Sequence, residues 1–165
     1  MRLNQDVSSI FCNGHKDPYI FCNGVQVWPA KVVTSHSIYL DFESGVEDNM
    51  TFQGLWWNGS QITESMVAEA SFKSGNSWNS IPAPYLRDML DTSSGMGIYC
   101  SALFIRIDSI TFNQFQWRTQ QYYAPEHKVT IKVQENSTTG IKYVGQKEVT
   151  QVANTTFTVN RGDTI

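Results

Sequence analysis

The sequence has little charge and no long hydrophobic run, and each absence excludes a class of protein. Only 16% of its 165 residues are charged, and 12 basic against 15 acidic side chains give a net charge of −3. No basic cluster is present, whereas binding to a phosphate backbone needs clustered Lys and Arg. No apolar run reaches the length of a transmembrane helix. We therefore expect neither a nucleic-acid-binding protein nor a protein inserted in a membrane.

Cysteine is also scarce, and its odd number argues against a complete disulfide framework. Cys12 and Cys22 have equivalent positions in a repeat, and Cys100 is the third. We expect the first two to be buried as small apolar residues. Three Cys and three scattered His lack the paired-ligand spacing of zinc sites. An acidic stretch at 41–49 offers oxygen ligands without the EF-hand spacing, so a solvated loop is favoured over a calcium site. The sequence predicts no metal and no cofactor.

Motifs of catalysis are missing as well. The sequence contains no Gly-x-Ser-x-Gly elbow, P-loop or dinucleotide-binding motif. His15, His36 and His127 fall in predicted loops or at strand edges. Asp41 and Glu43 stand two residues apart on a predicted strand and are the candidate carboxylate pair of a glycosidase. Such a pair is far more often a solvated face. We therefore expect a protein that is not an enzyme, with a glycosidase as the third alternative.

What the sequence does contain is a tandem repeat near its start. The pentapeptide Ile-Phe-Cys-Asn-Gly occurs at 10–14 and returns at 20–24. Asn-Gly readily takes the two positive φ values of a type I′ turn, and Val25–Trp28 alternates like a returning strand. We therefore predict two β-hairpins in tandem, forming an attachment segment over residues 1–29. The side chains expected to make its assembly contacts are Phe11, Phe21, Val27 and Trp28.

From residue 30 onward, period-two alternation of apolar and polar residues dominates. Two stretches predict short helices, Thr63–Ala70 with a Thr cap and Pro84–Leu90 with Pro near the start. Many short strands separated by polar turns indicate an all-β fold, an antiparallel β-sandwich of jelly-roll type over 30–165. The principal predicted strands cover residues 37–42, 50–57, 98–112, 115–119, 128–133, 141–144, 149–152 and 155–159.

Aromatic residues beside polar turns are the candidate binding residues. Trp56 and Trp57 precede an Asn-Gly turn, and one of these indoles should be buried and the other partly exposed, because adjacent strand residues face opposite ways. Trp78 falls in a Gly/Asn/Ser loop, and Tyr122 and Tyr123 flank a turn containing Pro. Exposed rings near amide groups suit stacking on sugars. Trp57, Trp78, Tyr122 and Tyr123 are therefore the predicted carbohydrate contacts, with core packing or a subunit interface as the simpler alternative.

The tandem unit, from Ser8 to Gly14 and from Pro18 to Pro29, resembles a short repeat of bacteriophage virion proteins. In that repeat a hydrophobic strand ends in a glycine turn, and the next strand finishes in Val-Trp. Cys12 and Cys22 stand where such repeats carry a larger apolar residue. Proteins of this kind are tail-fibre, baseplate or head-decoration components. The resemblance implies a virion or extracellular location, other virion proteins as partners, a homo-oligomer with a trimer favoured, and host-surface glycan as a ligand.

These observations together predict a non-enzymatic virion structural protein that contributes to host attachment. The main alternative is a carbohydrate-binding module of a bacterial surface or secreted protein. The two differ in assembly, because a module should be monomeric whereas a virion component should self-associate. An Arg-Gly-Asp tripeptide at 161–163 would suit adhesion, but a tripeptide occurs by chance too often to carry a prediction.

Overall fold

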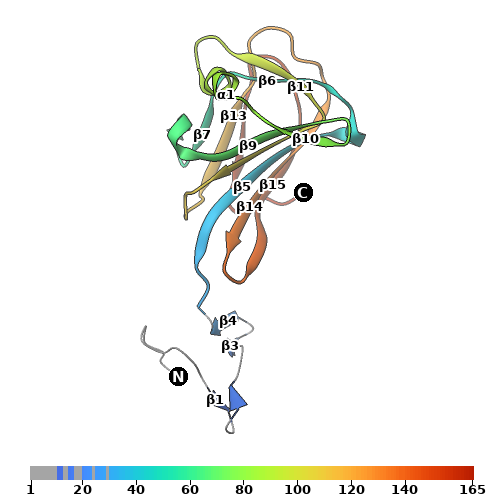
Figure 1. Ribbon diagram of the computed structural model, residues 1–165. Helices are drawn as coiled ribbons and strands as arrows, with labels where there is room; N and C mark the ends of the chain where they lie inside the picture. Colours follow the sequence, from blue (N-terminus) through green and yellow to red (C-terminus); the bar gives the residue numbers. More distant parts are fainter. Residues whose placement is uncertain (1–10, 13–14, 17–19, 24, 29) are drawn as a thin grey trace.

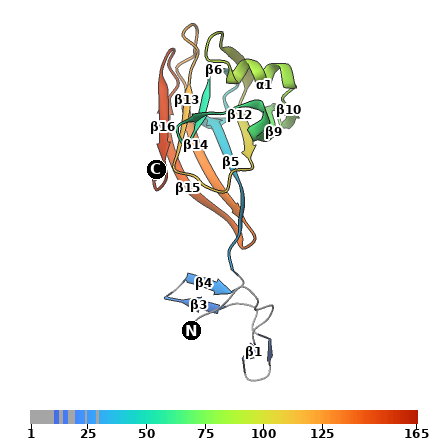
Figure 2. The same cartoon turned by 90° about the vertical axis from the view of Figure 1, so that its left-hand side faces the viewer.

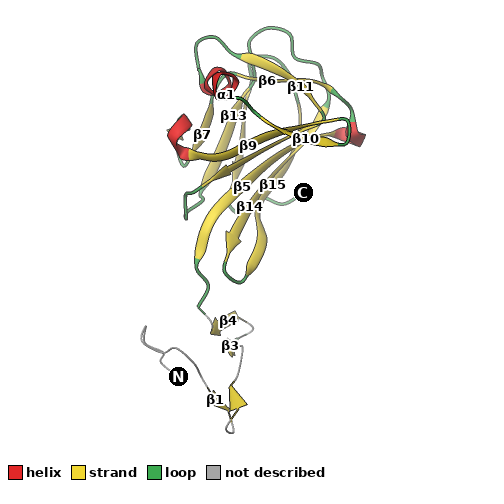
Figure 3. Cartoon of the chain, in the orientation of Figure 1, coloured by secondary structure: helices red, strands yellow, loops and turns green. Residues whose placement is uncertain are grey.

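The computed structural model describes residues 11–12, 15–16, 20–23, 25–28 and 30–165. The side chains of the strands before residue 30 lie outside this description. Every strand pairing in it is antiparallel. Figure 3 shows a molecule made mostly of strands, with a single α-helix in its described part. The predicted all-β antiparallel sandwich is confirmed.

The N-terminal repeat forms two hairpins. Strand β1 (Phe11–Cys12) pairs with β2 (His15–Lys16), and β3 (Ile20–Cys22) pairs with β4 (Val25–Trp28). Asn23, in the turn of the second hairpin, has a φ of 51°, which agrees with the Asn-Gly prediction. Among the described residues these strands pair only with one another. The assembly role of Phe11, Phe21, Val27 and Trp28 stays a prediction, because their side chains lie outside the described part, as do those of Cys12 and Cys22.

Two antiparallel sheets form the sandwich from residue 33 onward (Figures 1 and 2). The larger sheet has the order β10 (Ser77–Ser80), β9 (Val67–Ser74), β12 (Ala102–Ile107), β5 (Val33–Phe42), β14 (Lys128–Ser137) and β15 (Gly140–Thr150). The smaller sheet has the order β16 (Thr156–Asn160), β13 (Gln114–Arg118), β7 (Leu55–Trp57) and β8 (Ser60–Gln61). A separate pair, β6 (Asp48–Phe52) with β11 (Met96–Cys100), lies near helix α1 (Ala83–Leu90) at one end of the sandwich.

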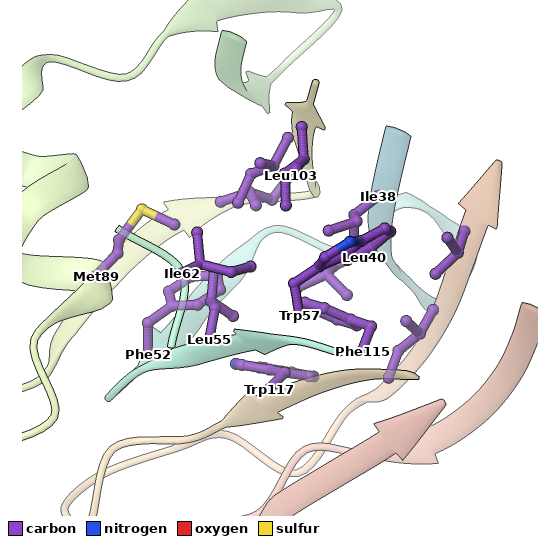
Figure 4. Packing of buried hydrophobic residues seen from close by; sticks show 14 of the residues in the cluster. Ile38, Leu40, Phe52, Leu55, Trp57, Ile62, Met89, Leu103, Phe115 and Trp117 are labelled. Atoms are coloured by element: carbon purple, nitrogen blue, oxygen red, sulfur yellow. The ribbon is translucent and has the colours of Figure 1, made fainter. Parts of the chain in front are cut away.

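The core lies between the two sheets, where alternate residues of each strand meet (Figure 4). Two tryptophans of the smaller sheet supply the largest buried rings, and each satisfies its indole N–H. Trp117 Nε1 donates to the Thr51 carbonyl at 2.9 Å, and Trp57 Nε1 donates to the Thr111 carbonyl at 3.1 Å. A buried indole thus costs no unpaired donor. Facing them from the larger sheet are Ile38, Leu40, Phe42, Leu103, Ile105, Ile107, Val129, Ile131 and Val133.

The predicted strand over 98–112 is in fact two strands in different sheets. The chain leaves β11 at Ser101 and enters β12, and Ser101 N donates to the Lys73 carbonyl at 2.9 Å at this crossing. Residues 108–113 then form a connection before β13. The predicted strand over 50–57 is divided in the same way between β6 and β7, at Gly54 with its φ of +111°. The alternation of apolar and polar residues continues across both breaks, because the strands before and after each break all bury one face. The sequence pattern alone therefore could not locate the point at which one strand ends and the next begins.

Of the two predicted helices, one is confirmed and one is wrong. Helix α1 buries Leu86, Met89 and Leu90 on one face, as the spacing of its leucines indicated. The stretch at 63–70 instead contains a single 3-10 turn, η2 (Glu64–Met66), and then enters β9. Residue Ala70 lies opposite Ile105 of β12. Pairing along β9 outweighs the modest helix propensity of this short stretch.

The edges of the two sheets meet where β15 approaches β16. The register of β14 and β15 shifts beyond Val133, and two backbone bonds then connect β15 to the turn after β16. Gly162 N donates to the Val144 carbonyl at 2.8 Å, and Gln146 N donates to the Asp163 carbonyl at 2.9 Å. A Cβ on Gly145 would lie 3.0 Å from the Asn160 carbonyl oxygen. The close approach of the two strands therefore requires glycine at 145.

Gly145→Ala should lower the free energy of unfolding by about 1–3 kcal/mol, because the added methyl overpacks the contact between β15 and β16. Gly97→Ala is the matched control, since its Cβ would meet only ordinary contacts of 3.7 Å or more on Asn49. The control should stay within about 0.5 kcal/mol of the parent protein. Urea denaturation of the three proteins measures both values, and equal stability of the two variants would contradict the tight approach.

A cluster of ionisable groups lies inside the sandwich beside these edges. His36 on β5 is fully buried, and its Nδ1–H donates to the Ser109 carbonyl at 2.7 Å. Its Nε2 has no hydrogen-bond partner among the described residues and lies 3.9 Å from Glu135 Oε2. Glu135 in turn binds Lys31 and, at 3.3 Å, Arg161. The imidazole thus faces a carboxylate that two cations already share.

Burial sets the direction in which these groups titrate. Desolvation lowers the pKa of His36 below its ordinary 6.5, although Ser109 and Glu135 act in the opposite direction. Burial raises the pKa of Glu135, but Lys31 and Arg161 outweigh it and leave that pKa below its ordinary value. A histidine whose pKa is lowered by folding contributes stability that is fully present above the pKa of the unfolded chain. This stability is lost as the pH falls from that value through the lower pKa of the folded protein.

The protein should therefore lose stability as the pH is lowered from 7.5 to 5.5, because the unfolded chain takes up the proton that His36 resists. Glu135 adds a further loss only at lower pH, below its ordinary 4.5. In His36→Gln the change between pH 7.5 and 5.5 should be smaller than in the parent. Urea unfolding at both pH values measures these differences. An unchanged pH dependence in His36→Gln would contradict the assignment.

Candidate functional site: an aromatic stripe on the larger sheet

The outer face of the larger sheet carries four aromatic side chains from four strands. The same alternation that sends Ile38 and Leu40 into the core sends Tyr39 outward, and it acts likewise on the other strands. Trp78 and Tyr143 are 46% and 48% exposed, while the two rings between them are half-buried. We call this set the aromatic stripe, and its members are Trp78 on β10, Phe104 on β12, Tyr39 on β5 and Tyr143 on β15.

The centre of the stripe is a hollow of about 270 Å³. It is bordered by Tyr39, Phe104 and Trp78 together with the polar side chains Glu69 and Ser71. Phe104 lies directly opposite Tyr39 in the sheet, and their ring centroids are 5.0 Å apart at a tilt of 43°. Tilted rings side by side expose parts of two π-faces to the same space. The hollow thus combines flat apolar surfaces with a hydroxyl and a carboxylate.

Charged side chains near the stripe act on the pKa values of Asp41 and Tyr39. Burial raises the pKa of Asp41, and the cations of Lys132 and Lys73 act to lower it. Burial, followed by the charge of Asp41, raises the pKa of Tyr39, so the Tyr39 hydroxyl keeps its proton as a hydrogen-bond donor. The Lys132 ammonium lies 5.8 Å from the centroid of the Tyr143 ring, within the range of a cation–π contact. The stripe therefore offers donors and acceptors beside each ring.

Trp78 reaches this face because residues 67–80 fold as a hairpin, whereas the sequence predicts a helix over 63–70 and a loop around Trp78. Strands β9 and β10 join at a turn that contains Gly75, with a φ of +59°, and Gly75 N donates to Glu47 Oε1 at 2.6 Å. This turn places Trp78 directly opposite Lys73, on the outer side of the sheet. The prediction that Trp78 is exposed is confirmed, and its setting is a strand at the sheet edge.

The other predicted carbohydrate contacts lie elsewhere. Trp57 is only 3% exposed and packs in the core, so its prediction as a sugar contact is wrong, and Trp56 is the partly exposed member of the pair. The side chain of Trp57 is fixed there by its bond to Thr111 and by packing against His36. Tyr122 and Tyr123 are exposed, as expected, but belong to the loop between β13 and β14 and not to the stripe.

Three members of the stripe were missed in the sequence. Tyr39 stands between Ile38 and Leu40, and Phe104 stands between Leu103 and Ile105, so both occupy positions where alternation calls for a polar residue. An aromatic ring at such a position is a usable signal of an outward-facing contact. That signal does not predict the order of the strands in the sheet. It is this order that brings residues from four separate segments to one face.

The candidate carboxylate pair, Asp41 and Glu43, does not share one face. Strand β5 ends at Phe42, so Asp41 faces outward from the sheet while Glu43 lies in the 3-10 turn η1 (Glu43–Gly45). Glu43 binds the backbone N–H of Lys128. The two acids therefore do not flank a common space, as a glycosidase would require.

The acidic loop at 41–49 is also divided among separate partners. Glu47 binds the turn at Gly75, and Asp48 Oδ2 lies 2.9 Å from His127 Nε2. Within the described residues, no group of three or more His, Cys, Asp or Glu side chains gathers around a common point. Glu47 and Asp48 thus connect the ends of strands to neighbouring segments.

The Arg-Gly-Asp tripeptide and Cys100 lie apart from the stripe. In the Arg-Gly-Asp tripeptide, Arg161 is paired with Glu135, and Asp163 Oδ2 accepts a bond of 2.8 Å from Asn160 N, so both side chains serve the turn after β16. Cys100 is buried, and desolvation raises the pKa of its thiol to about 12, which leaves it unreactive as a nucleophile.

A second hollow, of about 520 Å³, lies between the β9–β10 hairpin, α1 and β11. Its rim carries the exposed rings of Tyr85 and Tyr99, and its lining includes Phe72, Ile81 and Ile98. It is larger than the hollow of the stripe, but apolar residues dominate its lining and no charged side chain lines it. Recognition of a hydroxyl-rich ligand needs placed polar groups beside the apolar surface, and the stripe provides them.

No helix in the described part of the chain is both long and apolar enough to cross a membrane. Comparison with known proteins does not assign the chain to a group: no protein family, no curated protein and no solved structure matches it.

Proposed function

We propose that this protein is a non-enzymatic attachment protein that binds surface glycan through the aromatic stripe. The observation that carries the proposal is the hollow formed by Tyr39, Phe104 and Trp78 beside Glu69 and Ser71. Sugar rings present flat patches of C–H groups edged by hydroxyls, and such a surface is matched by exposed aromatic rings with hydrogen-bonding side chains between them. A buried core would not need three rings on its solvent side.

We further propose that the protein acts as a component of a phage virion, such as a fibre, a baseplate or a head decoration. Two observations support this assignment. The N-terminal repeat resembles that of virion proteins, and the repeat folds as two hairpins that pair, among the described residues, only within themselves. In this proposal the hairpins join the protein to other virion proteins or to further copies of itself, with a trimer favoured.

A free-standing carbohydrate-binding module is the second candidate. It is favoured by the fact that every side chain of the stripe comes from the larger sheet, downstream of the hairpins. Binding of glycan alone would therefore not require the N-terminal segment. The two candidates share the binding site and differ in whether the chain assembles.

Replacement of Trp78 by Ala should weaken glycan binding at least tenfold, because Trp is enriched among the contacts whose truncation costs more than about 1.4 kcal/mol of binding free energy. Binding is measured on a glycan array and then by titration calorimetry with the strongest ligand. Tyr122→Ala and Tyr123→Ala serve as controls, since both remove an exposed ring outside the stripe. If Trp78→Ala binds like the parent protein, the stripe is not the glycan site.

Light scattering of the full chain over a range of concentrations should give a mass of about three times the 18.7 kDa of one chain. The double variant Phe11→Ser, Phe21→Ser should shift this mass toward the monomer, because it removes an apolar ring from each hairpin. A monomer at all concentrations would contradict self-assembly and favour the free-standing module.

A further inference from the structure

We infer that the ligand is a neutral, linear oligosaccharide that lies obliquely across the strands of the larger sheet, and not a single terminal sugar. The inference rests on the proposed glycan-binding function and extends it to the class of ligand. It follows from three features of the outer face, which are the direction of the stripe, its length, and the pairing of the charges beside it.

The stripe runs diagonally across the sheet. Phe104 and Tyr39 are direct neighbours in register, and Lys132 of β14 is the direct neighbour of Tyr39 on its other side. The next ring, Tyr143 of β15, pairs with Gln134, two residues along from Lys132. Each strand thus adds one large side chain, and the last ring is displaced along the sheet.

At the β10 end of the stripe, Trp78 is displaced from Phe104 along the strands in the direction that continues the same diagonal. Trp78 of β10 lies opposite Lys73 of β9, whereas Phe104 of β12 lies opposite Ser71 of the same strand. The step from Trp78 to Phe104 is therefore also two residues along the strands, and the hollow that joins these rings confirms that they border one space. A continuous oblique track follows, from the edge at β10 to the edge at β15.

The length of the track exceeds a single sugar ring. Neighbouring strands lie about 4.8 Å apart, so the five spacings from β10 to β15 separate the ends of the stripe by roughly 24 Å. Figure 1 shows the strand directions turning progressively from β9 and β10 to β14 and β15. A ligand that follows the stripe must twist with this surface, which a linear oligosaccharide can do through the torsions of its glycosidic bonds.

The cations beside the track each act on a carboxylate, either Glu69 or Asp41. Arg106 Nη1 lies 3.1 Å from Glu69 Oε2. Asp41 is influenced by both Lys132 and Lys73, and Lys132 also faces the ring of Tyr143. An acidic sugar would have to compete with these carboxylates for the cations, so the face favours an uncharged ligand.

Uncharged polar side chains occupy the remaining outward positions near the rings. Thr130 and Gln134 lie on β14, and Gln146 lies on β15 opposite Lys132. All three are half-buried, which limits the freedom that they lose on binding. Hydroxyl and amide groups of this kind donate to and accept from sugar hydroxyls along the track.

The inference is tested on an array of linear oligosaccharides. The array carries neutral chains from disaccharide to hexasaccharide, and carboxylated or sulfated chains of the same lengths. The parent protein should bind neutral chains, with affinity that rises by at least tenfold from disaccharide to hexasaccharide. Tyr143→Ala should weaken binding of the hexasaccharide by about two- to tenfold, as expected for the loss of one aromatic contact, and should leave the disaccharide unaffected. Tyr143→Phe should bind like the parent.

The results separate failure of the inference from failure of the proposed function. Binding that needs Trp78 but is equal for short and long chains, or that is restricted to acidic chains, would overturn the oblique neutral track and retain the glycan site. The absence of binding to every chain, or binding that Trp78→Ala does not reduce, would overturn both. Tyr99→Ala removes an exposed ring at the larger hollow and is the matched control. Thermal melting of each variant verifies that the sandwich is intact.

Discussion

Burial of one face of each sheet is the constraint on which the rest of this structure depends. Strands β5, β12 and β14 place branched aliphatic side chains opposite Trp57 and Trp117, and the indole N–H groups of these tryptophans are both bonded to backbone carbonyls. Removal of this apolar surface from water is the dominant favourable contribution to folding. Because side chains alternate along a strand, fixing the inner face also fixes every residue of the outer face. The position of the aromatic stripe is a direct consequence.

The edges of the sandwich are stabilised by polar contacts as well as apolar ones. Glu135 is buried on β14 and forms ion pairs with two cations, Lys31 from the segment before β5 and Arg161 from the turn after β16. It thereby connects the beginning and the end of the sandwich through one carboxylate. Buried ionic groups of this kind add less stability than their charges suggest, because desolvation opposes the attraction. They do fix which segments meet, and the backbone bonds between β15 and the turn at Gly162 act in the same place.

The proposed site uses the side of the larger sheet that the core leaves free. Its central rings are rigid because Tyr39 and Phe104 are half-buried and packed on each other, whereas Trp78 and Tyr143 at the two ends are more exposed. A preorganised aromatic surface loses little conformational entropy on binding. The stripe consists of side chains from β10, β12, β5 and β15 of the larger sheet.

The sequence by itself determined the all-β class, helix α1, and the Asn-Gly turns at Asn23 and at Asn58, because these depend on local periodicity and on backbone conformations that few residues adopt. Only the tertiary structure decided that 98–112 divides between two sheets, that Val67 enters a strand and that Trp57 is the buried indole. Alternation says that a strand has two faces, but not which neighbour covers each of them. The aromatic stripe belongs to the same category, since its rings come from four separate strands that only the sheet order brings together.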